Sequence, residues 1–468
     1  MRFLLSATAI GLGLFACVSQ GDQGPAGGPG AAGAAGAAGS AGPAGSGGPT
    51  GDAGGVPTVV VLSARAKAGL DASPVPVNIN GLSSADVEKI GYGSYLMNAI
   101  GDCNRCHGST DSPPKFLAGG QKFDLSGGNF VYAKNITTGG PALSEADFIS
   151  AFQTGTDPAK KSEALLVMPW EYYRWMSVED LKAMYGYLKA IPAVTNPVSS
   201  DSKGALAKPP VPLATSYNDG DADPDRTDLP ADGSTDPNSV LRGLAIQPLV
   251  TPPGFGNAAP PDGGSVASIP DQERFGRGSY LVNSIGACSS CHTNPARIGT
   301  KINTAAYLSG GQVFNVPAPL ASVIHQKRNM SQNLSGRTHG YTDSYAAFLS
   351  IFDQGIHSLD SQKEAVGWPM PWQTLRNMVP EDQEAIYTYI LNVPLRTGSS
   401  DKETTSNVEW CAATSDCTWN PGETCNTANN ECVGMACTAD TDCSACQKCT
   451  VGHCVAPIAS SACVSQGI

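Results

Sequence analysis

The sequence predicts a mainly α fold that contains two tandem copies of one domain. Residues 91–107 recur at 276–292 with the same spacing, and apolar residues in both copies repeat at helical intervals. Outside the copies, glycine stands at every third position from 21 to 54, and ten cysteines lie between 411 and 463. The expected architecture is two helical domains between a disordered, collagen-like N-terminal spacer and a small disulfide-rich C-terminal module.

Each copy ends in the pattern Cys-x-x-Cys-His. Two thiols one helical turn apart can add across the two vinyl groups of a porphyrin, and the adjacent imidazole can then bind the iron. A single such pattern could arise by chance or hold a disulfide or zinc, but its duplication inside a longer shared segment argues against chance. We therefore predict two covalently bound haem c groups. The predicted attachment residues are Cys103, Cys106, Cys288 and Cys291, and the predicted iron ligands beside them are His107 and His292.

A Met-Pro-Trp tripeptide begins at Met168 and again at Met370. Methionine is the sixth ligand that raises the reduction potential in cytochromes c, so both residues are predicted iron ligands. Ordinary core packing is the alternative for any methionine beside a tryptophan. The second copy also offers competing side chains in His325, His339 and His357. Two six-coordinate irons leave no place for a substrate, so we expect no catalytic residue and no enzymatic activity.

The composition limits the class of partner and the compartment. The chain has 468 residues and a formal net charge of -12, which argues against nucleic acid as a partner because a phosphate-binding surface needs a basic patch. Of its 15 cysteines, four belong to the haem motifs and ten to the tail. An even, dense set of this kind indicates about five disulfides in an oxidising compartment.

The N-terminus predicts export and lipid attachment. Arg2 precedes an apolar run that is too short to span a membrane, and the run ends in Leu-Phe-Ala before Cys17. This ending resembles the lipobox of bacterial lipoproteins, in which the cysteine is acylated; a plain cleavable signal is the alternative. Val18 stands where an aspartate would favour inner-membrane retention. We expect an outer-membrane lipoprotein, periplasmic or surface-exposed, whose glycine-rich segment is a flexible spacer or a weak collagen triple helix.

Composition shifts and helix signals divide the chain into six segments. They are the signal peptide 1–16, the lipidated cysteine and spacer 17–57, the first domain 80–197, a Pro/Asp/Gly linker 198–270, the second domain 271–400 and the Cys-rich module 408–468. The apolar part of the linker, 240–250, is expected to pack onto a haem domain. Helices are expected from about Ser84, from Ser144 to Gly155, from Ser177 with Asp180 completing a capping box, and from Thr342 to Gly355.

Further matched segments extend the repeat over whole domains. Gly-Gly-Gln at 119–121 has a counterpart at 310–312, and Asn-Ile-Thr at 135–137 is matched to Asn-Met-Ser at 329–331. Gly91 and Gly93 lower the stability of the first helix, which indicates that another helix approaches closely there.

With Cys-x-x-Cys-His, Gly-Gly-Gln, Asn-Ile-Thr, Met-Pro and the run from Met176 to Leu188, the chain resembles the cytochrome c subunits of bacterial membrane-bound alcohol and gluconate dehydrogenases. The resemblance covers about 85–197 and, more loosely, 272–396. It implies two tandem cytochrome c domains and a subunit that takes electrons from a catalytic dehydrogenase and passes them toward the respiratory chain. The family carries three haems where this chain has two motifs.

Three functional classes follow from these observations. The leading hypothesis is a dihaem electron carrier between a periplasmic or surface oxidoreductase and a respiratory acceptor, with redox proteins as partners and the membrane bound through the lipid. The alternatives are a cytochrome subunit of an alcohol or sugar dehydrogenase complex, and a dihaem peroxidase in which one iron exposes its distal side. The collagen-like stalk and the Cys-rich tail also suit a surface-interaction protein.

Overall fold

The computed structural model of the chain describes two long stretches and short parts of the tail. The described residues are 61–210 without 112 and 139–142; 239–246 and 248; 272–396 without 299–300, 316–327, 337–343, 356–365 and 367; and 413–414, 424–426, 431–433, 448–450 and 453–455. The predicted signal peptide, Cys17, the collagen-like spacer and the three competing histidines lie outside the described residues. The described chain is mainly helical, which confirms the predicted fold class at that level.

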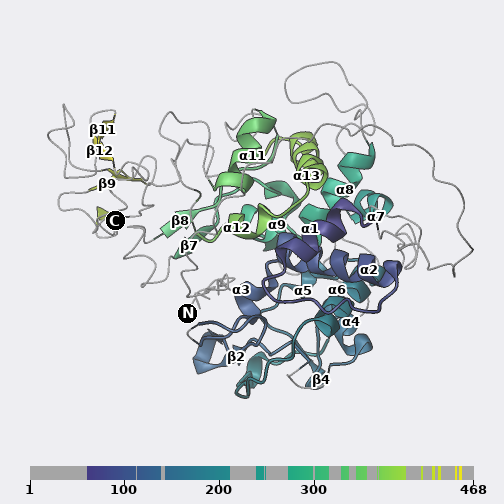
Figure 1. Cartoon of the computed structure of the whole chain (residues 1–468). Coiled ribbons are helices and arrows are strands. Elements are labelled where there is room, and N and C mark those ends of the chain that lie inside the picture. The colour runs from purple at the N-terminus through teal and green to yellow at the C-terminus, as the bar shows by residue number, and fades with distance from the viewer. Residues whose placement is uncertain are drawn as a thin grey trace, which may run out of the picture.

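The first half of the described chain, 61–210, contains helices and two short antiparallel strand pairs (Figure 1). Its helices are α1 (Ala64–Ala72), α2 (Ser84–Tyr95), which the π-helix η1 (Leu96–Ile100) continues, α3 (Cys103–His107), α4 (Glu145–Gln153), α5 (Trp170–Tyr173) and α6 (Val178–Ala190). Its antiparallel pairs are β1 (Lys122–Asp124) with β2 (Phe130–Tyr132) and β3 (Thr156–Asp157) with β4 (Lys160–Ala164); short 3-10 turns occur at Ser126–Gly128 and Gly204–Leu206.

The second half, 239–396, repeats this order. Its helices are α7 (Val240–Ile246), α8 (Gln272–Asn283), α9 (Cys288–His292), the 3-10 turn η4 (Thr304–Ala306), α11 (Tyr345–Gln354), α12 (Trp372–Leu375) and α13 (Pro380–Asn392). Its antiparallel pairs are β5 (Arg297–Ile298) with β6 (Lys301–Ile302) and β7 (Val313–Asn315) with β8 (Arg328–Met330). In the tail, β9 (Thr424–Asn426) pairs with β10 (Glu431–Val433) and β11 (Lys448–Thr450) with β12 (His453–Val455).

Serine caps begin the helices where the sequence predicts them. The hydroxyl oxygens of Ser83, Ser144 and Ser177 each accept a hydrogen bond from the backbone N–H three residues on, at 3.1 to 3.2 Å. Ser344 caps α11 in the same way, so the helix expected from Thr342 begins at Tyr345 instead. The predicted ends at Gly155 and Gly355 are confirmed, because the last helical residues lie just before them.

The central helix of each half lies between two others at close range. A Cβ on Gly91 would stand 2.5 Å from the carbonyl oxygen of Ala66 in α1, and one on Gly93 would overlap the backbone of α6 at Ala183. The predicted close approach at these glycines is therefore confirmed, and it involves two different helices. In the second half, a Cβ on Gly276 would stand 2.6 Å from the carbonyl oxygen of Val240 in α7. The described apolar part of the predicted linker thus packs on α8.

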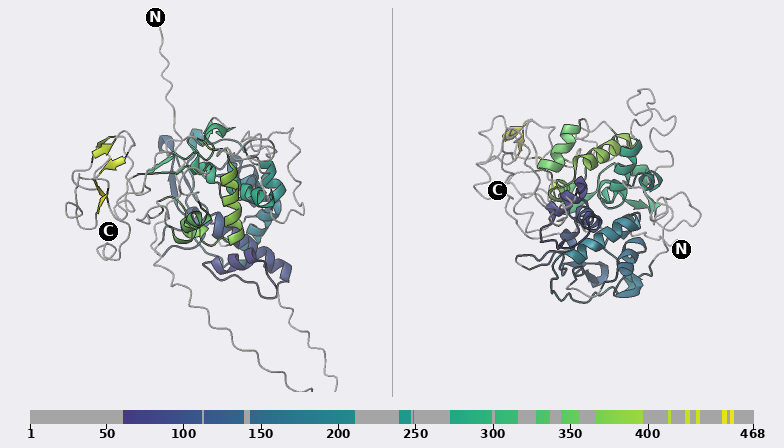
Figure 2. Two further views of the ribbon diagram at one scale, coloured as in Figure 1. Left: turned by 90° about the horizontal axis from the view of Figure 1, so that it is seen from above. Right: turned by 45° about the vertical axis from the view of Figure 1, so that its right-hand side comes forward.

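The two halves bury one shared hydrophobic core. Its largest fully buried members include Trp175, Tyr187, Tyr280 and Tyr389, which come from both halves. Figure 2 shows from two further sides that the helices of the two halves pack against each other. Because apolar burial is the main favourable contribution to folding, the halves stabilise each other as parts of one body.

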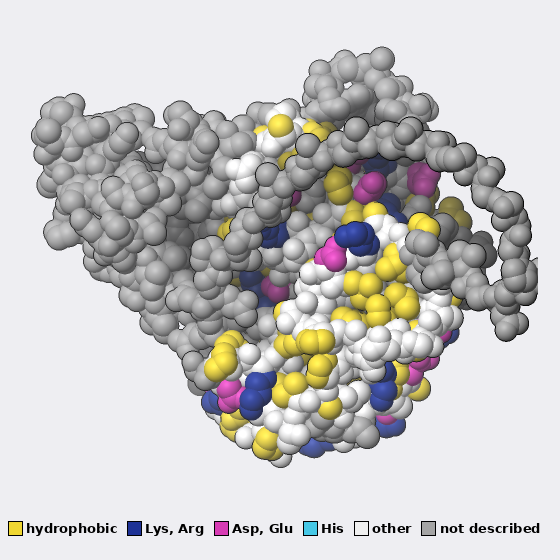
Figure 3. Space-filling model, in the orientation of Figure 1, with side chains coloured by type: hydrophobic (Ala, Val, Ile, Leu, Met, Phe, Trp, Pro, Cys, Tyr) yellow, Lys and Arg dark blue, Asp and Glu magenta, His cyan; other side chains and the backbone are white. Residues whose placement is uncertain are grey.

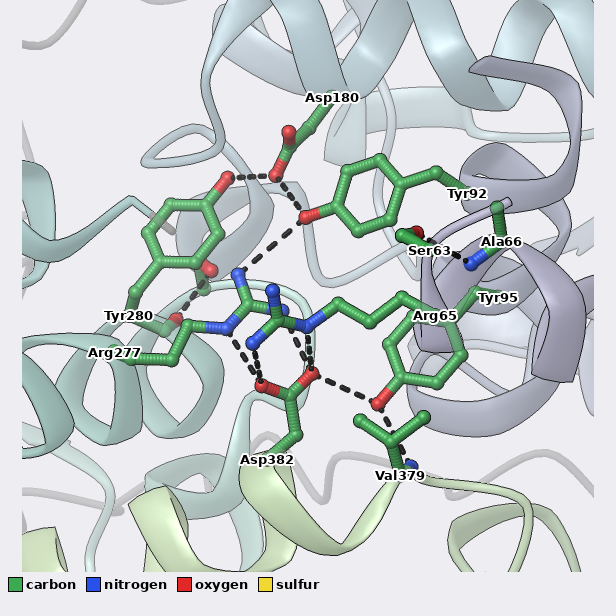
Figure 4. Close-up of polar contacts among 11 residues, drawn as sticks. Ser63, Arg65, Ala66, Tyr92, Tyr95, Asp180, Arg277, Tyr280, Val379 and Asp382 are labelled. Carbon is green, nitrogen blue, oxygen red and sulfur yellow. Dashed lines mark hydrogen bonds and ion pairs between the residues drawn. The ribbon is translucent and has the colours of Figure 1, made fainter. Parts of the chain in front are cut away.

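Tyrosines from each half cap the last helix of the other (Figure 4). The hydroxyl of Tyr95 in α2 donates to the Asp382 carboxylate at 2.8 Å and accepts from the backbone N–H of Val379 at 3.2 Å. Tyr280 in α8 makes the matching pair of bonds to Asp180 and to the N–H of Ser177, at 2.6 and 3.0 Å. The capping box predicted at Ser177 is thus half formed, because its backbone N–H bonds a tyrosine of the other half.

The charges around these two aspartates differ sharply. Two guanidinium groups hold Asp382: Arg277 donates at 2.9 and 2.8 Å and Arg65 at 3.0 and 2.8 Å. Burial alone would raise the pKa of Asp382, but the two arginines outweigh burial and hold the pKa well below its usual range. Asp180 accepts bonds from the hydroxyls of Tyr280 and Tyr92, and burial raises its pKa.

Ion pairs on the surface contribute far less than this buried cluster. The Lys67–Asp71 and Arg274–Glu384 pairs join exposed or half-exposed side chains at 2.6 and 2.8 Å, and exposed pairs stabilise a protein by about 0–1 kcal/mol. On the described surface in Figure 3, basic and acidic side chains are interspersed with hydrophobic ones. The electrostatic contribution that holds the halves together therefore lies at the buried carboxylates.

Replacing Asp382 by Asn should destabilise the protein by about 3–5 kcal/mol, because it leaves the buried Arg277 without its counter-charge. The measurement is denaturant unfolding followed by circular dichroism at neutral pH. Asp180→Asn is the matched control, since it sits at the equivalent position and pairs mainly with hydroxyl groups. Equal losses in the two variants would contradict the assigned role of the arginines.

The two variants should also change the pH dependence of stability in opposite directions. The depressed pKa of Asp382 provides stability that is present above the unfolded-state value of 3.8 and is lost as the pH falls toward the folded-state pKa. The raised pKa of Asp180 makes stability fall as the pH rises from 3.8 through its folded-state pKa. Asparagine cannot titrate, so unfolding curves measured across acidic pH should lose the first dependence in Asp382→Asn and the second in Asp180→Asn.

Candidate haem sites

Both Cys-x-x-Cys-His motifs form a short helix after a sharp backbone turn. Asp102 precedes α3 with φ 47° and ψ 42°, and Ala287 precedes α9 with φ 45° and ψ 35°. These are left-handed conformations, which cost energy for residues other than glycine and are kept only where the surrounding structure imposes them. The turn allows each motif to leave the preceding helix at a new angle. Within each short helix the two cysteines are three residues apart and share one face.

The histidine of each motif is oriented by a backbone carbonyl. His107 Nδ1 lies 2.7 Å from the carbonyl oxygen of Lys134, and His292 Nδ1 lies 2.8 Å from that of Gln332. Only a protonated Nδ1 can donate to a carbonyl, so the lone pair of each neutral ring is on Nε2. Burial lowers the pKa of both imidazoles, which favours the neutral ring that a metal requires. This arrangement fits an axial iron ligand in both halves.

The cysteines of both motifs are partly buried. Burial, reinforced by the charge of Asp102, raises the pKa of Cys103 to about 12, and burial raises that of Cys288 to about 12. Cys103, Cys288 and Cys291 are free thiols, whereas Cys106 is in a disulfide. That disulfide must be reduced before Cys106 can form a thioether with a haem vinyl group.

The two Met-Pro-Trp tripeptides occupy equivalent places. Pro169 precedes α5 and Pro371 precedes α12, and Met168 and Met370 are half-buried against the shared core. The indole of the tryptophan in each tripeptide packs directly on a glycine. A Cβ on Gly155 would overlap the indole of Trp170, and a Cβ on Gly355 would overlap that of Trp372. A fixed indole two residues away holds each methionine segment in place.

A β-hairpin joins each haem motif to its methionine segment. In the first half, Cys106, Leu166 and Val167 pack against the same pair of hairpin residues, Phe123 and Val131. In the second half, the ring of Phe314 meets that of Trp368 edge to face, with centroids 6.5 Å apart. The structure thus packs the residues just before both predicted methionines against a hairpin, and in the first half the same hairpin also contacts Cys106 of the motif.

The structure corrects one sequence match. The segment equivalent to Asn-Ile-Thr at 135–137 is 333–335 and not 329–331. Asn333 Nδ2 donates to the Arg396 carbonyl and Ser335 N to Asn333 Oδ1, as Asn135 donates to Val194 and accepts from Thr137. The sequence match at 329–331 was wrong because the β7–β8 connection is longer than its counterpart. Two similar tripeptides also lie close together here, Asn-Met-Ser at 329–331 and Asn-Leu-Ser at 333–335.

The two motifs face each other across the interface between the halves. A Cβ on Gly101 would stand 2.9 Å from Ile285 Cδ1 of the other half. Burial raises the pKa of Tyr173, and the nearby Cys103, Asp102 and Cys291 groups raise it further. The sequence contains no signal for this juxtaposition, because it depends on how the halves dock.

Comparison with known proteins finds cytochrome subunits of bacterial dehydrogenases among the relatives of the chain. The chain is 26% identical over 70% of its length to the fructose dehydrogenase cytochrome subunit of Gluconobacter japonicus. It is 30% identical over 43% of its length to the gluconate 2-dehydrogenase cytochrome c subunit of Pantoea cypripedii. It is 28% identical over 48% of its length to the cytochrome c subunit of the quinone alcohol dehydrogenase of Gluconobacter oxydans. No protein-family model matches the chain.

These matches confirm the resemblance to cytochrome c subunits of bacterial dehydrogenases and support haem c as the cofactor. The chain covers 57%, 37% and 41% of the lengths of these three relatives, in the same order. Each of these relatives is named as the cytochrome subunit of a dehydrogenase.

Gly155→Ala should displace Trp170 and, with it, the Met168 segment, because the added Cβ overlaps the indole. We expect a loss of about 1–2 kcal/mol from the left-handed backbone alone and a further loss from the clash. The matched control is Gly128→Ala, which has φ 74° and no atom within 4 Å of the added Cβ. Thermal unfolding and near-ultraviolet circular dichroism measure both effects. A tryptophan spectrum changed equally by both substitutions would show that the glycine does not seat the indole.

Proposed function

We propose that the chain is a dihaem c-type cytochrome in which each half is one cytochrome c domain. The observation that supports this best is the paired geometry of the two motifs: each has two cysteines on one helical turn and a partly buried imidazole whose Nδ1–H bonds a backbone carbonyl. Cys103 and Cys106 would attach one haem, and Cys288 and Cys291 the other. His107 with Met168, and His292 with Met370, would hold the two irons.

Haem c supplies reversible one-electron transfer at its iron. The chain's own residues bind the group, exclude water and set the potential. The backbone carbonyls fix the tautomer and orientation of the imidazoles, and the soft methionine sulfurs favour ferrous iron, so both potentials would be high. The close approach of the two motif regions at Gly101 and Ile285 suits transfer between the halves.

We infer that the protein receives electrons from an oxidoreductase and delivers them to a respiratory acceptor. The names of the relatives support a dehydrogenase as donor, with an alcohol or a sugar derivative as that enzyme's substrate. The N-terminal pattern supports an exported lipoprotein held on the periplasmic or surface side of the outer membrane through Cys17. Fractionation of a Cys17→Ser variant tests the anchor. Among the described residues, no helix is long and apolar enough to cross a membrane.

Haem content tests the cofactor assignment. The mature protein should contain two haems per chain by the pyridine haemochromogen assay, and replacing Cys103 and Cys106 together by Ser should leave one. Replacing Cys288 and Cys291 together is the matched control and should also leave one. Any count other than two in the parent protein would refute the dihaem assignment.

Reduction kinetics test the role. Stopped-flow mixing of the ferric protein with a purified dehydrogenase and its substrate should reduce both haems faster than the substrate alone. Mixing the ferrous protein with peroxide should give only slow, unsaturable oxidation, because both irons are six-coordinate. Saturable oxidation by peroxide at catalytic rates would replace the carrier with a peroxidase.

A further inference from the structure

The motif of the first half contacts the methionine segment of the second half on both sides of Met370. The Nη1 of Arg105, which lies between the two motif cysteines, donates a hydrogen bond to the carbonyl oxygen of Pro369. On the other side, the hydroxyl of Thr374 donates to Asp102 Oδ1 at 2.8 Å. Pro369 directly precedes Met370, and Thr374 lies one helical turn after it.

Arg105 and Asp102, which make these two contacts, also form an ion pair with each other. Asp102 Oδ2 accepts from Arg105 Nε at 2.8 Å, and each of these side chains is 21% exposed. A partly buried, charge-assisted pair of this kind holds its geometry better than exposed groups do. A third contact lies nearby, where the Asn377 side chain donates to the backbone carbonyl of Asn98 at 3.2 Å. The Met370 segment is therefore hydrogen-bonded to Asp102, which precedes α3, to Arg105 within α3 and to Asn98 of η1.

The second motif lacks this ion pair. The positions in the second motif that correspond to Asp102 and Arg105 are Ala287 and Ser290, which carry no charge. The hydroxyl of Ser290 has its hydrogen bond with the adjacent Cys291 sulfur at 3.7 Å. The Asp102–Arg105 pair therefore has no counterpart in the second motif, whereas Arg297, five residues after His292, places its charge near Tyr172 of the Met168 segment.

We propose that Arg105, through Asp102, is a positioning residue for Met370, so that the first haem domain strengthens the bond between Met370 and the iron of the second. This inference rests on the proposed function, since it requires Met370 to be the sixth ligand. It also gives the second haem a different ligand stability from the first.

Imidazole titration of the ferric protein measures the strength of each methionine–iron bond, because imidazole must displace the methionine. Met370→Ala should tighten one of the two binding phases and so identify the phase of the second haem. Arg105→Ala should tighten that same phase about tenfold, the order expected when a charged donor to a carbonyl is removed. The phase of the first haem should stay unchanged, and Arg105→Lys, which keeps a charged donor, should restore part of the effect.

Two further variants separate positioning from general damage. Lys115→Ala removes a surface cation of the first half that pairs with Asp111 at 2.8 Å, and it should leave both phases unchanged. Thr374→Val removes the bond to Asp102 from outside the haem motif, so it serves even if Arg105→Ala hinders haem attachment. It should tighten the second-haem phase by a smaller factor.

The outcomes distinguish the two claims. If Met370→Ala tightens a phase while Arg105→Ala and Thr374→Val leave it unchanged, the positioning role is wrong and the ligand assignment stands. If Met370→Ala changes neither phase, Met370 is not the ligand and the assignment itself fails. If Arg105→Ala tightens both phases equally, the arginine stabilises the fold in general and the proposal is overturned.

Discussion

The buried carboxylate of Asp382 is the interaction on which the arrangement of the two halves depends. Asp382 lies near the start of α13 and binds side chains from three other helices: Arg65 from α1, Tyr95 from α2 and Arg277 from α8. A charge removed from water is tolerable only when it is paired and hydrogen-bonded, and this one is paired twice. The geometry of the pairing therefore fixes how the halves dock.

The docking in turn decides what the haem sites can do. The tyrosine caps at Ser177 and Val379 align the last helix of each half against the other half, and the segments that precede the two motifs meet at Gly101 and Ile285. A carrier with independent domains on a long linker would have to bring its haems together by diffusion. In this chain, the shared core keeps the two motifs adjacent at all times.

The duplication is regular in its backbone and irregular in its charges. Close-packed glycines, histidine–carbonyl bonds and indoles packed on a glycine occur in both halves at equivalent positions, and Ser144 and Ser344 cap equivalent helices. The differences are single side chains: Arg277 stands where the first half has Tyr92, and Arg105 where the second half has Ser290. Because of Arg277, the pKa of Asp382 is lowered while that of the equivalent Asp180 is raised. Because of Arg105, the first motif binds the segment that contains Met370. Two copies of one scaffold can thereby acquire different ligand strengths and potentials.

The residues that carry local chemistry could be read from the sequence. The cysteine and histidine spacing, the serine caps at Ser83, Ser144 and Ser177, and the small residues at Gly91 and Gly93 act over a turn or two of helix, where sequence neighbours are also spatial neighbours. The correct partner of Asn135 was missed because register across a longer connection is a property of hydrogen bonding and not of tripeptide similarity. The bonds of Tyr95, Tyr280 and Arg105 to the opposite half join residues at least 100 positions apart, and the pattern around each of them is that of an ordinary helix. Only the packing of the two halves decides those contacts, because burial and charge pairing depend on which surfaces meet.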